Sequence, residues 1–200
     1  MPDISPTLVK ELREKTNAGM MDCKRALDET SGDMVKAEEL LRKKGIASAS
    51  KKASRTAREG IIASYIHLQG KVGVLVEINC ETDFVAKNDV FREFVKDITL
   101  HIAASHPLYV SREQVPETLV QAEREIYAAQ VTGKPANIVD KIVDGKMDKF
   151  FSTICLLEQA FIKNPDLTIK DFVNSKIAEL GENIVIRRFT RYMVGEDPGS

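Results

Sequence analysis

The fold is decided by residues 72–84, which have the sequence VGVLVEINCETDF. Within this stretch, branched apolar side chains occupy alternate positions: Val72, Val74, Val76 and Ile78. Because successive side chains of a strand point to opposite faces, these four lie on one face of an extended segment. The stretch ends in an acidic and an aromatic residue, Asp83 and Phe84. It therefore predicts a half-buried strand that leads into an acidic, aromatic corner.

A second strand and a helix are predicted on either side of this stretch. Residues 61–68 predict a partner strand, and Gln69-Gly70 suits a hairpin turn because glycine tolerates a positive φ angle. Downstream, Asn88 or Asp89 can cap a helix. The apolar residues of that helix recur at helical spacing: Val90, Phe91, Phe94, Val95, Ile98 and Ile102.

The C-terminal half predicts further helices and one more strand. Pro116 and Gly133-Lys134-Pro135 each open a helix, and Gly145 closes the second of them. Residues 168–171 form a capping-box pattern before another helix. Residues 182–194 are rich in branched and aromatic side chains and predict a strand that joins the hairpin. The predicted fold class is therefore α+β, with a three-stranded antiparallel sheet covered by helices.

The N-terminal part predicts a compact module of three short helices within residues 1–45. Asn17-Ala18-Gly19 separates the first two helices, Asp33 can cap the third, and Gly45 can stop it. Each helix carries its own apolar positions, so the module can bury a small core.

A basic segment follows, because residues 43–58 are rich in Lys, Arg, Ala and Ser and lack a sustained apolar stripe. This composition indicates a linker, part of it helical. An alternative hypothesis is that the segment binds RNA, with an affinity that falls steeply with salt. We divide the chain into residues 1–55, the helical module with its linker, and residues 56–200, the core that holds the sheet.

The overall composition favours a protein partner over nucleic acid or a membrane. Lys plus Arg number 29 and Asp plus Glu number 30, so the chain has no strong attraction for a polyanion. No apolar run approaches the roughly 20 residues that span a bilayer. The cysteines Cys23, Cys80 and Cys155 have the spacing of neither a disulfide framework nor a metal site, so we expect no metal and a reducing, cytoplasmic location.

The sequence contains no recognisable catalytic group. His67, His101 and His106 are its only histidines, and none has a nucleophile or carboxylate at motif spacing. No loop ends in Gly-Lys-Ser or Gly-Lys-Thr, so we expect no bound nucleoside triphosphate and no other cofactor. These features predict a binding protein rather than an enzyme.

The residues of the corner alone allow two interpretations. In the first, Thr82 or Asp83 caps a turn and Phe84 is the first core residue of the following helix. In the second, Asp83 and Phe84 project toward a partner protein.

Two long strings resemble a known family. Residues 12–24 have the sequence LREKTNAGMMDCK and residues 77–87 have EINCETDFVAK; shorter matches are LHIAAS at 100–105 and GENIVIRRF at 181–189. In these strings the chain resembles the elongation factor Ts family over nearly all of its length. The resemblance implies a guanine-nucleotide exchange factor that binds the GDP form of elongation factor Tu, displaces Mg²⁺ and promotes GDP release so that GTP can rebind.

The resemblance also assigns roles to two groups of residues. Thr82, Asp83, Phe84 and Val85 match the segment that dislodges Mg²⁺ from elongation factor Tu, with the phenylalanine inserted between two helices of its nucleotide-binding domain. The N-terminal helices resemble a ubiquitin-associated domain that docks on the same part of elongation factor Tu. The apolar contact positions there are matched by Leu12, Met20 and Met21. Their alternative role is in the interior of the module, because so small a domain needs most of its apolar side chains there.

The expected assembly is a homodimer. Longer members of the family carry two related core subdomains, whereas this chain has one. The resemblance implies that a second copy supplies the missing surface, so that the dimer binds two molecules of elongation factor Tu in a 2:2 complex. An unpaired sheet edge makes such pairing physically reasonable. A ubiquitin-type adaptor built on the N-terminal helices is a further alternative, but nothing in the rest of the chain requires it.

Overall fold

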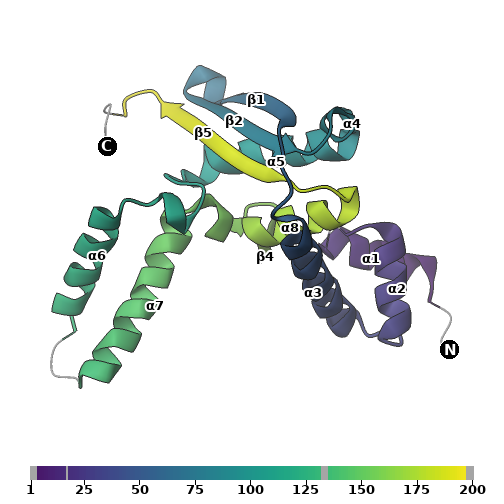
Figure 1. Cartoon of the computed structure of the whole chain (residues 1–200), viewed down its shortest axis with the longest axis horizontal. Helices are drawn as coiled ribbons and strands as arrows, with labels where there is room; N and C mark the ends of the chain where they lie inside the picture. Colours follow the sequence, from purple (N-terminus) through teal and green to yellow (C-terminus); the bar gives the residue numbers. More distant parts are fainter. Residues whose placement is uncertain (1–3, 17, 132–134, 197–200) are drawn as a thin grey trace.

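The computed structural model describes residues 4–16, 18–131 and 135–196. Three N-terminal helices precede a three-stranded sheet with helices packed on it, and one pair of helices projects from the core (Figure 1). The helices are α1 Pro6–Thr16, α2 Met20–Glu29, α3 Met34–Lys52, α4 Asp83–Lys87, α5 Asp89–Ser105, α6 Glu117–Ala129, α7 Ala136–Ile154 and α8 Ile169–Leu180. The strands are β1 Glu59–His67, β2 Val72–Cys80, β3 Ala160–Phe161, β4 Asn164–Thr168 and β5 Val185–Met193. This arrangement confirms the predicted α+β class.

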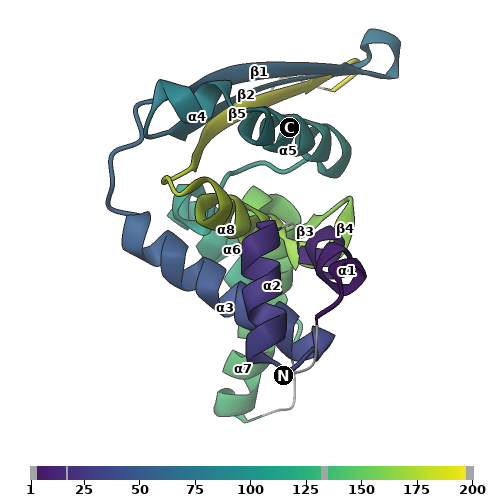
Figure 2. The same ribbon diagram turned by 90° about the vertical axis from the view of Figure 1, so that its right-hand side faces the viewer.

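The sheet has the order β1-β2-β5, and both pairings are antiparallel. The alternating apolar residues of β2 face inward, and each is at most 3% exposed: Val72, Val74, Val76 and Ile78. They belong to one core with residues of α5 and α8. Figure 2 shows α5 directly beneath the sheet and α8 beneath α5. The predicted hairpin and the C-terminal strand that joins it are thus confirmed.

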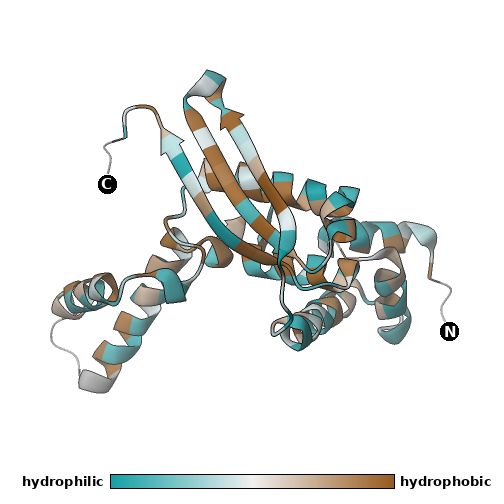
Figure 3. Cartoon of the chain, turned by 45° about the horizontal axis from the view of Figure 1, so that its top comes forward, coloured by the Kyte–Doolittle hydropathy of each residue, from teal (hydrophilic) through white to brown (hydrophobic). Residues whose placement is uncertain are grey.

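The opposite face of the sheet is left open by the helices of the described chain (Figure 3). It carries four large apolar side chains that are exposed, which we call the outer sheet face: Ile62, Ile66, Leu75 and Tyr192. Gly73 pairs with both Ile66 and Tyr192, so these two side chains lie on the same side of the sheet. An antiparallel sheet often leaves one face to water, and here the four apolar side chains share that face with polar ones, including the Glu77–Arg188 ion pair.

The N-terminal helices form their own core, as predicted, but the end of the third helix was predicted wrongly. Helix α3 runs through Gly45 to Lys52 and includes much of the segment that the sequence indicated as a linker. Gly45 is buried, and a Cβ placed there would lie 3.7 Å from the backbone oxygen of Asn174 in α8. The glycine therefore lies where two helices pack closely, and contacts with α8 sustain the helix beyond it.

The predicted end of the helix at Gly145 was also wrong. Helix α7 continues to Ile154 because Val143 and Met147, one turn apart around the glycine, are both buried in a separate small core with residues of α6. Pro135 precedes the first turn of α7, as expected for a proline at a helix start. Gly133 and Lys134, which were predicted to open this helix, lie outside the described residues.

A small hairpin, β3 and β4, was not predicted. Strand β3 has two residues and β4 includes Pro165, so neither shows the alternation that indicates a strand. Through the described ranges, no helix is long and apolar enough to cross a membrane. Within the same ranges, no group of three or more His, Cys, Asp or Glu side chains could hold a metal ion.

Candidate functional site

The corner between β2 and α5 is built by two successive helix caps. The Thr82 hydroxyl accepts a hydrogen bond from the backbone N–H of Val85 at 3.4 Å, which begins the five-residue helix α4. The Asn88 side chain then accepts one from the N–H of Val90 at 2.8 Å, which begins α5. Side chains of this type satisfy backbone donors that a helix leaves unpaired in its first turn. Of the predicted alternatives, Thr82 and Asn88 are therefore the capping residues.

Phe84 lies on the outside of this corner, with 82% of its surface exposed. The interpretation of Phe84 as a core residue is therefore wrong. The apolar contact that fixes α4 on the sheet core comes instead from Ala86, which is 6% exposed, with Val85 half-buried beside it. The other seven phenylalanines of the chain are buried or half-buried. Because the exposed ring contributes little apolar burial to the fold, it is available for contact with a partner.

Asp83 is the first residue of α4, and its carboxylate accepts a hydrogen bond from the Lys87 ammonium at 2.7 Å. This hydrogen bond, together with the positive charge of Lys87, lowers the pKa of Asp83 below its ordinary value of 3.8. The carboxylate is therefore ionised at neutral pH. Both side chains are more than half exposed, so the ion pair is weak and can exchange for contacts with a partner.

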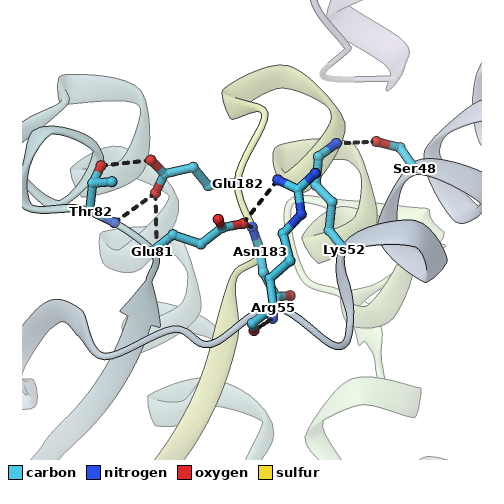
Figure 4. A network of polar contacts seen from close by, with 7 residues as sticks. All are labelled: Ser48, Lys52, Arg55, Glu81, Thr82, Glu182 and Asn183. Atoms are coloured by element: carbon cyan, nitrogen blue, oxygen red, sulfur yellow. Dashed lines mark hydrogen bonds and ion pairs between the residues drawn. The ribbon is translucent and has the colours of Figure 1, made fainter.

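A turn distant in sequence holds the corner from behind. Glu182, between α8 and β5, accepts hydrogen bonds from the backbone N–H groups of Glu81 and Thr82 at 3.0 Å each, and from the Thr82 hydroxyl at 2.6 Å (Figure 4). No local pattern in the sequence marks Glu182 as a site residue. Glu182 belongs to the string at 181–189 that resembles the family, but only the fold places this string next to residues 77–87.

The three candidate contact residues of the N-terminal module differ in their solvent exposure. Met20 and Met21, at the start of α2, are 53% and 65% exposed, whereas Leu12 is 0% exposed and lies in the core of the three-helix module. The side chain of Leu12 therefore packs inside the module rather than on its surface. Helices α2 and α4 lie apart in both views of the ribbon, so the methionines and the corner form two separate surfaces (Figures 1 and 2).

A cavity of about 340 Å³ lies between the N-terminal module and the core. Gly19 and Val35 line it on one side, and Leu167 and Asn174 on the other. None of the four corner residues from Thr82 to Val85 borders it. The corner is therefore a protruding surface rather than a ligand pocket, and it suits contact with a protein.

Comparison with known proteins decides the family. A protein-family model described as elongation factor TS matches residues 10–196. The chain belongs to the elongation factor Ts family. Membership in the elongation factor Ts family confirms the predicted function of a non-enzymatic nucleotide exchange factor in translation elongation, with elongation factor Tu as the partner that the family implies.

Similar proteins named elongation factor Ts match almost end to end. The protein from Carboxydothermus hydrogenoformans is 60% identical over 195 residues, which cover 96% of this chain and 90% of the relative. The protein from Thermoanaerobacter sp. is 58% identical, with 96% of each chain covered. That from Thermodesulfovibrio yellowstonii is 55% identical over 194 residues, with 96% of this chain and 97% of the relative covered.

Proposed function

We propose that this chain accelerates GDP release from elongation factor Tu by inserting Phe84 into its nucleotide-binding domain and displacing Mg²⁺. The observation that carries the proposal is the 82% exposure of Phe84 on a short, capped helix. Burying one such side chain in a partner supplies about 2 kcal/mol, which is comparable to the contribution of an interfacial hot spot. That free energy is available to repack two helices of the partner.

The mechanism needs no catalytic group, because it follows from linkage. A partner that binds the Mg²⁺-free or nucleotide-free form of a GTPase more tightly than the loaded form weakens nucleotide binding by the same factor. Mg²⁺ bridges the phosphates and neutralises their charge, so its loss loosens GDP. GTP then rebinds and releases the exchange factor.

Each corner residue has a distinct part in this proposal. Phe84 enters the partner, and Val85 extends the apolar contact beside it. Asp83, ionised at neutral pH and held only by an exposed lysine, offers a carboxylate near the site of the metal. Thr82 caps the helix that presents all three.

Met20 and Met21 supply a second contact with the nucleotide-binding domain of elongation factor Tu. Their exposure supports this role, and flexible thioethers suit protein-binding surfaces. Leu12, being buried, acts only by holding the module together.

The outer sheet face supports the proposed homodimer better than the sheet edge on which the expectation was based. Ile62, Ile66, Leu75 and Tyr192 are 47–73% exposed and lie on the same face, which the Glu77–Arg188 ion pair beside Ile62 also occupies. A second copy that packs its own outer sheet face against them would bury all four in a two-sheet sandwich. Two corners then remain free to engage two molecules of elongation factor Tu. The three buried, free cysteines are compatible with action in the reducing cytoplasm.

The function is tested with elongation factor Tu loaded with fluorescent GDP. Release into excess unlabelled GDP is followed with and without this chain, at millimolar Mg²⁺ and again in EDTA. We expect a large acceleration in Mg²⁺ and a much smaller one in EDTA, where the metal is already gone. An unchanged release rate at saturating amounts of the chain in Mg²⁺ would refute the proposed function.

A further inference from the structure

Helix α4 cannot hold its own geometry. It has only five residues, and isolated helices of this length do not persist in water. Among its side chains only Ala86 is buried, so few contacts define how the helix is rotated on the sheet. The direction in which Phe84 points must therefore be fixed by groups outside the helix.

Glu182 is such a group, and its carboxylate acts on the start of α4. One oxygen, Oε2, accepts from the backbone N–H groups of both Glu81 and Thr82, and the other, Oε1, accepts from the Thr82 hydroxyl (Figure 4). The same hydroxyl oxygen accepts the capping hydrogen bond from the Val85 N–H. Glu182 therefore orients the capping side chain of Thr82 as well as the backbone before α4. A carboxylate can accept all three hydrogen bonds, whereas an amide has only one oxygen, so its NH₂ group would face either the Thr82 hydroxyl or the two backbone N–H groups, and at least one of the three bonds would be lost.

A reciprocal contact locks the two turns together. Glu81 accepts a hydrogen bond at 2.6 Å from the backbone N–H of Asn183, the residue after Glu182. Asn183 is 4% exposed and donates through its side chain to the backbone oxygen of Arg55 at 2.9 Å, while the Arg55 guanidinium lies 3.5 Å from Glu81. We call Glu81, Glu182 and Asn183 the clasp. It ties the corner to the segment before β5 and to the end of the linker from the N-terminal module.

We propose that Glu182 is a positioning residue for nucleotide exchange, fixing the first turn of α4 so that Phe84 is held in the orientation that enters the partner. This inference rests on the proposed function of Phe84. Glu182, from the string at 181–189, would then contribute to nucleotide exchange without contacting elongation factor Tu. Loss of the Glu182 charge leaves Phe84 exposed but mobile, and a mobile ring loses entropy when it inserts.

The first test needs no partner. The chain contains no tryptophan, so Phe84→Trp introduces a single fluorescent reporter at the corner. We expect Glu182→Gln in this background to lower the fluorescence anisotropy of the reporter and to shorten its slow decay component. The matched control is Glu158→Gln, which removes a carboxylate that pairs with Arg112 beside α7, away from the corner. Equal anisotropy for both variants and the Phe84→Trp parent would overturn the proposal.

The second test is a double-mutant cycle on GDP release from elongation factor Tu. We expect Glu182→Gln to lower the saturating release rate about three- to tenfold in Mg²⁺, the range that corresponds to one hydrogen bond of ordinary strength, while Glu158→Gln leaves it unchanged. In a Phe84→Ala background Glu182→Gln should have no further effect, because there is no ring left to position. Circular dichroism and melting curves check the fold. Should Glu182→Gln melt early, Glu182→Asp, which keeps the charge but shortens the side chain and leaves the Thr82 cap in place, replaces it in the cycle.

The outcomes separate the two proposals. If the parent chain does not accelerate release, the proposed function fails. If the parent accelerates GDP release and Phe84→Ala slows it, the proposed function stands. The positioning role of Glu182 is then refuted by either of two results: Glu182→Gln releases GDP as fast as the parent, or Glu182→Gln slows release by the same factor in the Phe84→Ala background as in the parent.

Discussion

At the scale of single residues, the helix-capping residues could be predicted from the sequence, whereas the solvent exposure of apolar side chains could not. Thr82, Asn88 and the capping box at Thr168 are confirmed because each depends on a side chain that hydrogen-bonds its own backbone a few residues away. The burial of Leu12 and the exposure of Phe84 depend on which elements pack against them. No local pattern contains that information.

The contrast between Leu12 and Met21 gives a prediction. Leu12→Ala removes a fully buried side chain and should lower the free energy of unfolding by about 2–5 kcal/mol. Met21→Ala truncates a side chain that is 65% exposed, so it should leave stability almost unchanged and weaken binding to elongation factor Tu. Urea unfolding and a binding titration measure the two effects. A Met21→Ala variant that binds as tightly as the parent would remove Met21 from the interface.

His101 gives a prediction about pH. Its ring is 0% exposed; one nitrogen lies 2.9 Å from the Gln159 side-chain oxygen and the other accepts from the Ile162 N–H. Burial lowers the pKa of His101 below its ordinary value of 6.5. The unfolded chain therefore binds the proton more readily, and this contribution to stability is full above about pH 6.5 and is lost as the pH falls toward the lower, folded pKa.

The measurement is the melting temperature from pH 8 to pH 5. We expect the fall between pH 7 and pH 5 to be smaller in His101→Gln than in the parent, whatever the variant's stability at pH 8. Parallel curves for the two proteins would show that His101 does not carry this dependence.

At the scale of elements, the strands and most helices could be predicted because their apolar periodicity is long and regular. Both errors in helix length occurred at glycines, Gly45 and Gly145, which were taken as helix ends. A glycine inside a helix has the same local signature as one after its end, and only the partner helix distinguishes them. The hairpin β3–β4 was missed because its strands are too short to show a period.

The packing around Gly45 leaves room for the methyl group of an alanine at this position. The added Cβ would lie 3.7 Å from the nearest atom, an ordinary contact, and alanine favours the helix by about 1 kcal/mol. Gly45→Ala should therefore raise the melting temperature. Gly60→Ala is the contrast, because Gly60 has φ +139° and a Cβ there would lie 2.2 Å from the backbone oxygen of Ile78. That variant should be strongly destabilised, and calorimetry of the pair tests both statements.

At the scale of the whole molecule, the open sheet predicts the assembly. Replacing Ile62 and Ile66 with aspartate places two charges on the outer sheet face and should convert the proposed dimer to a monomer. Ile126→Asp, on α6 and 50% exposed, is the matched control and should remain dimeric. Sedimentation equilibrium at micromolar concentration reads out the mass. A parent chain that sediments only as a monomer would contradict the dimer.

In the folded molecule, strings that are far apart in the sequence lie next to each other. Residues 77–87 and 181–189 form one structure around the corner, joined by hydrogen bonds between positions about 100 residues apart. Within residues 12–24, Met20 and Met21 form a second exposed surface, on a different module. In the proposed function the chain contacts elongation factor Tu at two points, and the point that carries Phe84 is held by Glu182.

The most direct measurement is GDP release from elongation factor Tu at saturating concentrations of the parent chain and of Phe84→Ala, in Mg²⁺ and in EDTA. Because the Phe84 side chain is 82% exposed, the variant should fold and melt like the parent. We expect GDP release to be at least about tenfold slower with Phe84→Ala than with the parent in Mg²⁺, as expected for losing a buried aromatic contact, and a much smaller difference in EDTA. Equal release rates for the two folded proteins in Mg²⁺ would contradict it.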